Sequence, residues 1–151
     1  MNLKDVTTLV EDVFKKHNLT DWKFTFSTSK RAFGDCNSYF KKIRLSKVLC
    51  ELNEEKHVID SLMHEIAHAL VGVKQRHNVI WKLKCREIGA NPERCYSSKD
   101  VIMPPAKHIY RCPGCGKDFN YNRLLKEHNR TACAICCKGK WKKQFILERV
   151  R

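Results

Sequence analysis

Residues 58–70 read Val-Ile-Asp-Ser-Leu-Met-His-Glu-Ile-Ala-His-Ala-Leu, and apolar side chains in this stretch recur on nearly every face of a helix. A helix that is apolar nearly all round is packed by other elements on several sides. We expect it to begin near Asn53, whose side chain can cap it, and to end at about Val71, because Gly72 is a common terminator. The sequence therefore predicts one long buried helix.

The same helix carries His64-Glu65-Ile66-Ala67-His68, the HExxH pattern. Side chains four residues apart lie one above the other on a helix, so both imidazoles can reach one zinc ion, with Glu65 beside them to handle a water molecule. Two histidines and a glutamate are costly to bury unless something satisfies them. We therefore predict a zinc site at His64 and His68, in preference to two hydrogen-bonded core histidines.

A catalytic zinc has three protein ligands and one open position, so a third ligand must come from elsewhere in the chain. His77 lies nine residues beyond His68, after the glycine that ends the helix, and it directly precedes another helical stretch that contains Trp81. The other candidate is Glu87, a glutamate on that following helix. We prefer His77.

The remaining sequence of this part predicts helices packed on a small sheet. Apolar residues at helical spacing predict further helices over about 3–17 and 79–88. Alternating apolar and polar residues predict short strands over 22–27, 31–33 and 39–45. We expect the strands to form an antiparallel sheet, which gives a core of the α+β class.

The chain has 151 residues, 42% of them hydrophobic and 30% charged, which suits one sizeable core with at most a small appendage. Its 30 lysines and arginines outnumber 16 acidic residues, a net charge of +14. Such a charge favours polyanionic partners, because binding releases counterions from phosphates, so we expect nucleic acid as its partner; the alternative is that the charge only keeps the protein in solution. Without a membrane-spanning run or a signal-peptide core, it is expected to have no membrane partner and to be intracellular, in cytoplasm or nucleus.

The positive charge is concentrated near the C-terminus. Residues 1–106 hold 18 basic and 13 acidic side chains, whereas residues 107–151 hold 12 and 3. Met103-Pro104-Pro105-Ala106 marks the join, because consecutive prolines neither continue a helix nor donate to a sheet. We therefore predict a core domain over 1–106 and a basic segment over 107–151.

Nine cysteines, an odd number, argue against a secreted disulfide framework. Four of them lie singly in the core domain, where we expect buried reduced thiols: Cys36, Cys50, Cys85 and Cys95. In the basic segment two CxxC pairs are separated by 17 residues, and they consist of Cys112 with Cys115 and Cys133 with Cys136. This spacing is typical of a four-cysteine structural zinc site of the zinc-ribbon kind, and the segment has too little apolar material to fold without metal.

The ligands of this second zinc have two alternatives. Cys137 follows Cys136 directly and can replace it. His128 creates the spacing of a ββα zinc finger that ends in Cys133, with a helix near residues 121–128. We favour the ribbon, because only it uses the second CxxC pair. Two zinc ions are therefore expected, one catalytic and one structural.

The basic segment is also the expected nucleic-acid surface, because its cations can neutralise phosphates. Exposed rings can stack on unpaired bases, but we expect the rings of Phe119 and Trp141 to pack the small core instead. The candidate contacts are Arg111, Lys117, Arg123, Lys126, Arg130, Lys138, Lys140, Lys142 and Lys143.

Over most of its length the chain resembles the SprT-like zinc metalloprotease family. The resemblance lies in Gly34-Asp35-Cys36, in residues 62–69 with the HExxH pattern, and in residues 77–82, which are similar to the family's His-Gly-x-x-Phe/Trp-Lys. Asn78 stands where the family usually has glycine, and asparagine tolerates a left-handed backbone better than most residues.

The resemblance implies a small zincin-like core with zinc ligands at His64, His68 and His77 and a general base at Glu65. It also implies a zinc-dependent endopeptidase that binds DNA and cleaves DNA-associated or DNA-crosslinked proteins, as in DNA-protein crosslink repair. The alternative is a non-proteolytic nucleic-acid-binding or transcription-associated protein whose histidine zinc is structural. The presence of Glu65 favours the enzyme, because a structural site does not need it.

Overall fold

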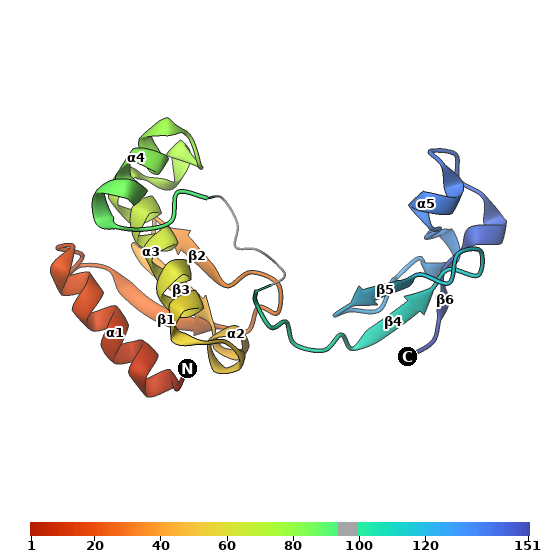
Figure 1. Cartoon of the computed structure of the whole chain (residues 1–151), viewed down its shortest axis with the longest axis horizontal. Helices are drawn as coiled ribbons and strands as arrows, with labels where there is room; N and C mark the ends of the chain where they lie inside the picture. Colours follow the sequence, from red (N-terminus) through yellow and green to blue (C-terminus); the bar gives the residue numbers. More distant parts are fainter. Residues whose placement is uncertain (94–99) are drawn as a thin grey trace. The chain divides into compact units, whose positions relative to one another are not determined.

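The computed structural model describes residues 1–93 and 100–151 (Figure 1). The chain divides into two compact units, Met1–Pro104 and Pro105–Arg151, and each is described by itself. No helix among the described residues is both long and apolar enough to cross a lipid bilayer.

The first unit opens with α1, Leu3–Lys16. The side chain of Asn2 caps this helix by accepting a hydrogen bond from a backbone N–H of its first turn. Val6, Val10 and Phe14 recur every four residues and form its buried face. The helix lies within one residue of the predicted range.

A three-stranded sheet follows, built from β1 (Lys23–Ser27), β2 (Gly34–Asn37) and β3 (Lys42–Ser46) in the order β1-β3-β2. β2 and β3 are antiparallel, but β1 and β3 are parallel. The prediction of an antiparallel sheet is therefore wrong for β1. After β1 the chain crosses over and reverses direction before β2. It then turns back into β3, which takes the central position beside β1. Ile43 and Leu45 of this central strand are completely buried.

The strand boundaries also differ from the predicted ones around the turn between β2 and β3. Residues 31–33 precede β2 instead of forming a strand, and β3 begins at Lys42. Tyr39 and Phe40, which were expected in the strand, lie in the turn and are 88% and 66% exposed. Alternation alone did not reveal that these two rings face solvent.

The helix predicted over about 53–71 is α3, Glu55–Val71, and a separate short helix that was not predicted, α2 (Lys47–Leu52), precedes it. Asn53 does not cap α3. Its side-chain amide lies between them, where it donates hydrogen bonds to the carbonyl oxygens of Leu49 and Ile102. The six residues of α2 are too few for a periodic pattern, which is why the sequence did not predict it.

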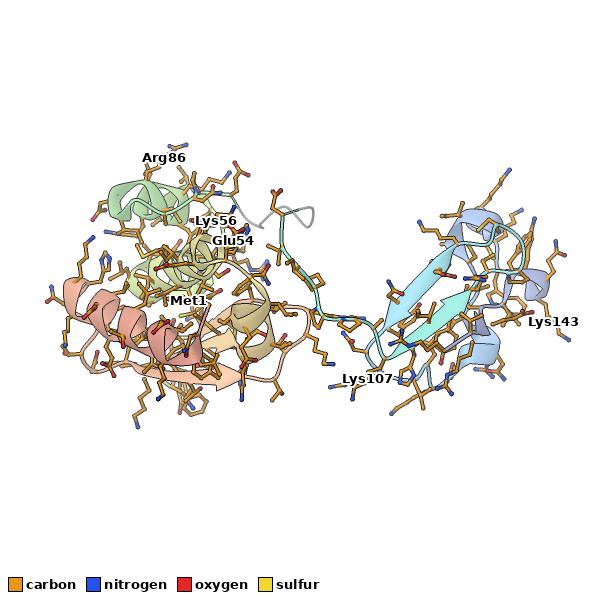
Figure 2. The ribbon with its side chains drawn as sticks, turned by 60° about the horizontal axis from the view of Figure 1, so that its bottom comes forward. Met1, Glu54, Lys56, Arg86, Lys107 and Lys143 are labelled. Atoms are coloured by element: carbon orange, nitrogen blue, oxygen red, sulfur yellow. The ribbon has the colours of Figure 1, made fainter. Side chains whose placement is uncertain are left out.

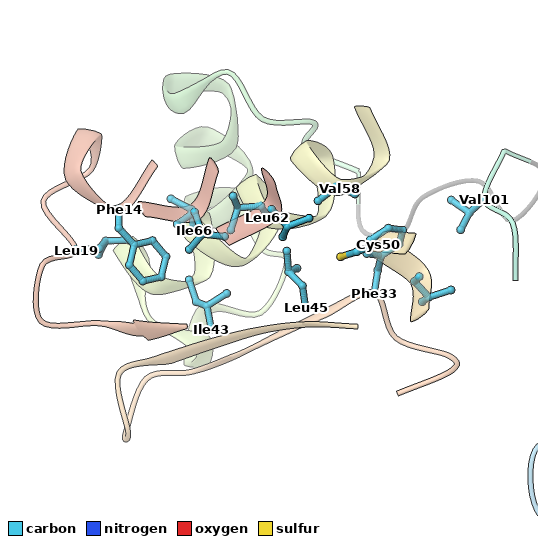
Figure 3. Close-up of a cluster of buried hydrophobic side chains, with 13 residues drawn as sticks. Phe14, Leu19, Phe33, Ile43, Leu45, Cys50, Val58, Leu62, Ile66 and Val101 are labelled. Carbon is cyan, nitrogen blue, oxygen red and sulfur yellow. The ribbon is translucent and has the colours of Figure 1, made fainter. Parts of the chain in front are cut away.

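The helix α3 contacts β2 and β3 of the sheet and also packs on α4, Val79–Ile88. The α4 helix has the predicted bounds, with the Asn78 side chain as its N-cap and Gly89 in a left-handed conformation at its C-cap. Figure 3 shows the main core between α1, α3 and the sheet, with the labelled side chains Phe14, Leu19, Phe33, Ile43, Leu45, Cys50, Val58, Leu62, Ile66 and Val101.

The lone cysteines of this unit are free thiols. Cys50 and Cys85 are buried as expected, whereas Cys36 is only half-buried. Burial, assisted by the negative charge of Glu65, raises the pKa of Cys36 to about 12. Cys95 lies outside the described residues.

The second unit contains a small antiparallel sheet in the order β5-β4-β6 and a short helix, α5. Their bounds are β4 His108–Arg111, β5 Asp118–Tyr121, α5 Ala134–Cys137 and β6 Glu148–Arg149. Its core is small and consists of Tyr110, Cys112, Cys133 and Leu147, with partly buried rings such as Phe119 packed against it. Two of the four core residues are members of the CxxC pairs.

Candidate metal centres

Three histidines of the first unit meet at one point. His64 and His68 lie one turn apart on α3, and the chain then turns back through Gly72 (φ 87) and the 3-10 helix Val73–Gln75. This return brings Nε2 of His77 to 3.1 Å from Nε2 of His64 and 3.2 Å from Nε2 of His68. The structure thus brings together the three residues that the sequence proposed as ligands.

Trp81 lies against all three imidazoles. Its ring centroid is 4.7 Å from that of His64, 5.3 Å from that of His68 and 4.7 Å from that of His77. The Asn78 side chain accepts a hydrogen bond from the Trp81 backbone N–H, so the cap of α4 fixes the backbone that carries this indole. A completely buried ring therefore limits the rotation of each imidazole.

The histidines are suited to a metal in protonation and in spacing. Burial, and then the neighbouring imidazoles, lower the pKa of both His64 and His68 to about 4, so at neutral pH these rings carry lone pairs and no charge. Two nitrogens bound tetrahedrally to zinc at about 2.0–2.1 Å lie about 3.3–3.4 Å apart, close to the separations of the Nε2 atoms. A proton on Nε2 of His77 can point at only one of its two neighbours, whereas a metal ion satisfies all three nitrogens.

Glu65 lies in the same cleft with only 8% of its surface exposed. Burial, with the charge of Asp35 as a second cause, raises the pKa of Glu65 to about 8. The backbone of Gly34 in β2 passes directly against this side chain. A Cβ at position 34 would come within 2.8 Å of Cγ and 3.0 Å of Oε1 of Glu65, so a side chain there would displace the carboxylate.

The cleft itself is open and has a volume of about 930 Å³. Strand β2 forms one wall, α3 the floor, and the segment between α3 and α4 the other wall. The residues that line it are Gly34, Asp35, Cys36, His64, Glu65, His68, Val73, Gln75, Arg76, His77, Asn78, Lys82 and Glu93. Glu87, the alternative third ligand, is absent from it and instead forms an exposed ion pair with Lys84.

Sequence reasoning missed three residues that shape this site. Gly34 was noticed only as part of a family resemblance, and its contact with Glu65 is not visible in the sequence. Trp81 was used to favour His77 but was given no role of its own. Arg76 adopts φ 49 and ψ −125, a conformation that favours glycine, immediately before His77. No signal in the sequence marks Arg76, because arginine gives no hint of a positive φ.

The second unit brings together the four cysteines of the two CxxC pairs. Each close contact joins one cysteine of the first pair to one cysteine of the second. Sγ of Cys112 lies 3.7 Å from Sγ of Cys136, and Sγ of Cys115 lies 3.8 Å from Sγ of Cys133. All four sulfur atoms lie within 4.8 Å of one another, which is the arrangement of a tetrahedral metal site. Burial acts to raise the pKa of Cys112, but hydrogen bonds from the backbone N–H groups of Cys115 and Gly114 outweigh it and lower this pKa to about 7.

Of the two alternative ligands, only Cys137 can be compared with this group. Cys137 is buried but is not among the four clustered cysteines. The helix that a ββα finger requires is not present over the described residues 121–127, because Tyr121 ends β5 and no helix follows before His128. The side chain of His128 lies outside the described part of the chain.

The nine basic residues proposed for nucleic-acid contact are all exposed. Two of them form ion pairs, Arg111 with Asp118 and Arg130 with Glu127. Lys143, labelled in Figure 2, projects from the surface of the second unit. The contact of these residues with nucleic acid stays a prediction.

The two rings that we expected to pack the small core behave differently. Phe119 is partly buried against it, as expected. Trp141 is 57% exposed, with its indole N–H bonded to the carbonyl of Arg130, so the expectation was wrong for Trp141. The core is already filled by Tyr110 and Leu147, which leaves the indole on the surface.

Comparison with known proteins gives two findings. Residues 3–100 match the SprT-like family. The chain is also similar to Protein SprT of Glaesserella parasuis serovar 5 (strain SH0165), with 28% identity over 132 residues that cover 82% of this chain and 83% of that protein. The family match spans both the HExxH helix and His77. This chain therefore belongs to the SprT-like family.

Proposed function

We propose that the chain is a zinc-dependent endopeptidase that binds DNA and cleaves proteins associated with or crosslinked to it. One observation carries the enzymatic part: three imidazole nitrogens converge beside the carboxylate of Glu65 in one open cleft. A purely structural zinc has four protein ligands and no need of a nearby base. Among the described residues, only the three histidines form the metal-binding group of this unit.

In this proposal, His64, His68 and His77 hold the catalytic zinc. When bound, zinc supplies Lewis acidity, which polarises a peptide carbonyl and brings the pKa of a water molecule to about 7. Glu65 takes the proton of the attacking water on a carboxylate oxygen and then gives it to the leaving amine. Gly34 holds this carboxylate close to β2, and Trp81 keeps the imidazoles oriented.

The four clustered cysteines hold the second, structural zinc, in a small zinc ribbon. Cysteine thiolates and their tetrahedral grouping suit this metal, and a unit with so small a core gains most of its folding free energy from binding it. The proposal therefore includes two zinc ions per chain, one in each unit.

The DNA part of the proposal is supported by charge. The nine exposed basic residues of the second unit can neutralise phosphates. A protease that is bound to the same DNA molecule as its protein substrate meets that substrate at a high effective concentration. The cleft is open, so we expect little sequence preference and a dependence on DNA for positioning.

The test is cleavage of a DNA-bound protein by the wild type and by Glu65→Gln, with and without DNA, after zinc has been measured in both. Glu87→Gln serves as the matched control, because Glu87 lies on the neighbouring helix in an exposed ion pair. We expect loss of cleavage by at least about a hundredfold in Glu65→Gln, consistent with the loss of a general base, and no change in Glu87→Gln. Zinc and DNA binding without cleavage by the wild type would instead indicate a binding module.

A further inference from the structure

We propose that the turn between β2 and β3, residues 38–41, is a stacking site for unpaired nucleic-acid bases beside the histidine cleft. The proposal deepens the proposed function and rests on its nucleic-acid part, because it assumes that the chain binds DNA. It adds a contact within the first unit, whereas the basic residues considered above all lie in the second.

The turn carries an aromatic tip, Tyr39 and Phe40, that folding does not explain. Tyr39 is 88% exposed, more than any other large hydrophobic side chain among the described residues, and Phe40 is 66% exposed. Their rings contact each other edge to face, with centroids 4.8 Å apart. Neither ring joins the hydrophobic core, so their burial contributes little to stability and their faces are free to contact a ligand.

The aromatic tip is held in place from three sides. The side chain of Asn37 accepts a hydrogen bond from the Phe40 N–H at 3.0 Å, and Lys41 forms an ion pair with Asp21. The Val73 N–H donates to Oγ of Ser38 at 3.4 Å, which ties the turn to the segment that follows α3. A platform that is already ordered loses less conformational entropy when it binds.

Three lysines belong to the segments next to the aromatic tip. Lys23 and Lys42 are cross-strand partners in β1 and β3, directly beside the turn, and Lys74 follows the residue that is bonded to Ser38. No ion pair with a carboxylate is present for Lys23, Lys42 or Lys74 in the described part of the chain. Exposed rings surrounded by uncompensated lysines suit a ligand that presents bases and phosphates together. A purely apolar partner would offer no negative charge to these lysines.

The position of the turn connects it to the cleft. Gly34, Asp35 and Cys36 of β2 line the cleft, and the same strand runs on into the turn. Val73, which bonds to Ser38, lines the cleft as well. A strand stacked on the aromatic tip would pass along the cleft wall and present an attached protein to Glu65.

This site is tested by the binding of a fluorescein-labelled oligothymidylate to the full chain, measured by fluorescence anisotropy. The oligonucleotide has about 12 nucleotides, because single-strand sites span about 4–16 nucleotides. The variants are Tyr39→Ala/Phe40→Ala, Tyr39→Leu/Phe40→Leu and the ring-preserving Tyr39→Phe/Phe40→Tyr. Stacking predicts about tenfold weaker binding for the first two and unchanged binding for the third. The matched control is Leu83→Ala, an exposed apolar residue of α4, which should bind as the wild type does.

The leucine variant separates base stacking from a general apolar contact with the oligonucleotide, because it keeps the apolar area and removes the ring faces. Binding equal to the wild type in both the alanine and the leucine variants would overturn the proposal. Weaker binding in the alanine variant alone would also overturn it, in favour of an apolar contact that does not need the ring faces. Zinc content and a circular dichroism spectrum like that of the wild type check that each variant is folded.

Photocrosslinking with an oligonucleotide that contains 5-iodouracil locates the contact directly, with peptide mapping by mass spectrometry. Adducts on Tyr39 or Phe40 support the stacking site. Adducts confined to residues 105–151 would overturn it and leave the proposed function intact. Failure of the wild type to bind the oligonucleotide would remove both this site and the DNA part of the proposed function, while peptide cleavage would remain a separate result.

Discussion

The two candidate metal centres are built on opposite principles. The histidine centre lies on α3 and on the segment just before α4, against the buried ring of Trp81 and beside two apolar core clusters. The cysteine centre lies in a unit whose small core contains Cys112 and Cys133 themselves. In the first unit, the packing of the apolar core positions the metal ligands. In the second unit, metal binding by the cysteines is expected to stabilise the fold. The same metal is therefore expected to serve chemistry in one unit and folding in the other.

Metal removal is the largest expected perturbation, and it should separate the two units. Structural zinc contributes about 10–16 kcal/mol to the folding of small zinc domains, so a chelator should unfold residues 105–151. The first unit should remain folded, because its core does not contain the metal. Hydrogen exchange measured by mass spectrometry should show lost protection in β4 and β5 and retained protection in α1 and β3. Equal loss in both units would contradict the distinction.

Substitution of Trp81 should have the next largest effect, because the ring fills the space beneath three imidazoles. We expect Trp81→Ala to lower the free energy of unfolding by about 3–5 kcal/mol and to weaken zinc binding at the histidines by about 10–100-fold. Trp81→Phe should restore most of both quantities. Denaturant unfolding and zinc competition measure them. Full zinc affinity in Trp81→Ala would show that α3 alone positions the ligands.

The contact between Gly34 and Glu65 predicts a more local effect. Gly34→Ala should lower the free energy of unfolding by about 1–3 kcal/mol and reduce cleavage, while zinc stays bound. In a background of Glu65→Ala, the same substitution should cost less, because the side chain that the Cβ meets is gone. A double-mutant cycle of unfolding free energies measures this coupling. Additive effects would mean that Leu45, 3.1 Å from the same Cβ, is the residue that matters.

The smallest expected effect concerns the backbone of Arg76. Its positive φ is strained for arginine, so Arg76→Gly should stabilise the folded protein by up to about 1 kcal/mol, with zinc affinity unchanged. Arg76→Ala keeps the strain and removes only the side chain, so it should give no such gain. Thermal unfolding of the two variants compares them. A loss of stability in Arg76→Gly would show that the arginine side chain holds the turn before His77.

Much of the candidate site was accessible from the sequence. His64, Glu65 and His68 lie within five residues of one helix, so helical geometry alone places them together. The CxxC pairs are similarly local, and their spacing led to the four cysteines that the structure clusters. The bounds of α1 and α4 followed from periodicity and capping residues. These features depend on residues that are close in the chain.

What the sequence determined by itself is the chemistry of the ligands and the elements that carry them, because spacing within a helix or a knuckle is set by local backbone geometry. The tertiary structure decided the parallel pairing of β1 with β3, the presence of the short helix α2 before α3 and the exposure of Tyr39 and Phe40. It also brought Gly34 against Glu65 and Trp81 beneath the histidines. Each of these depends on competition for buried space between segments far apart in the chain, which no local pattern records.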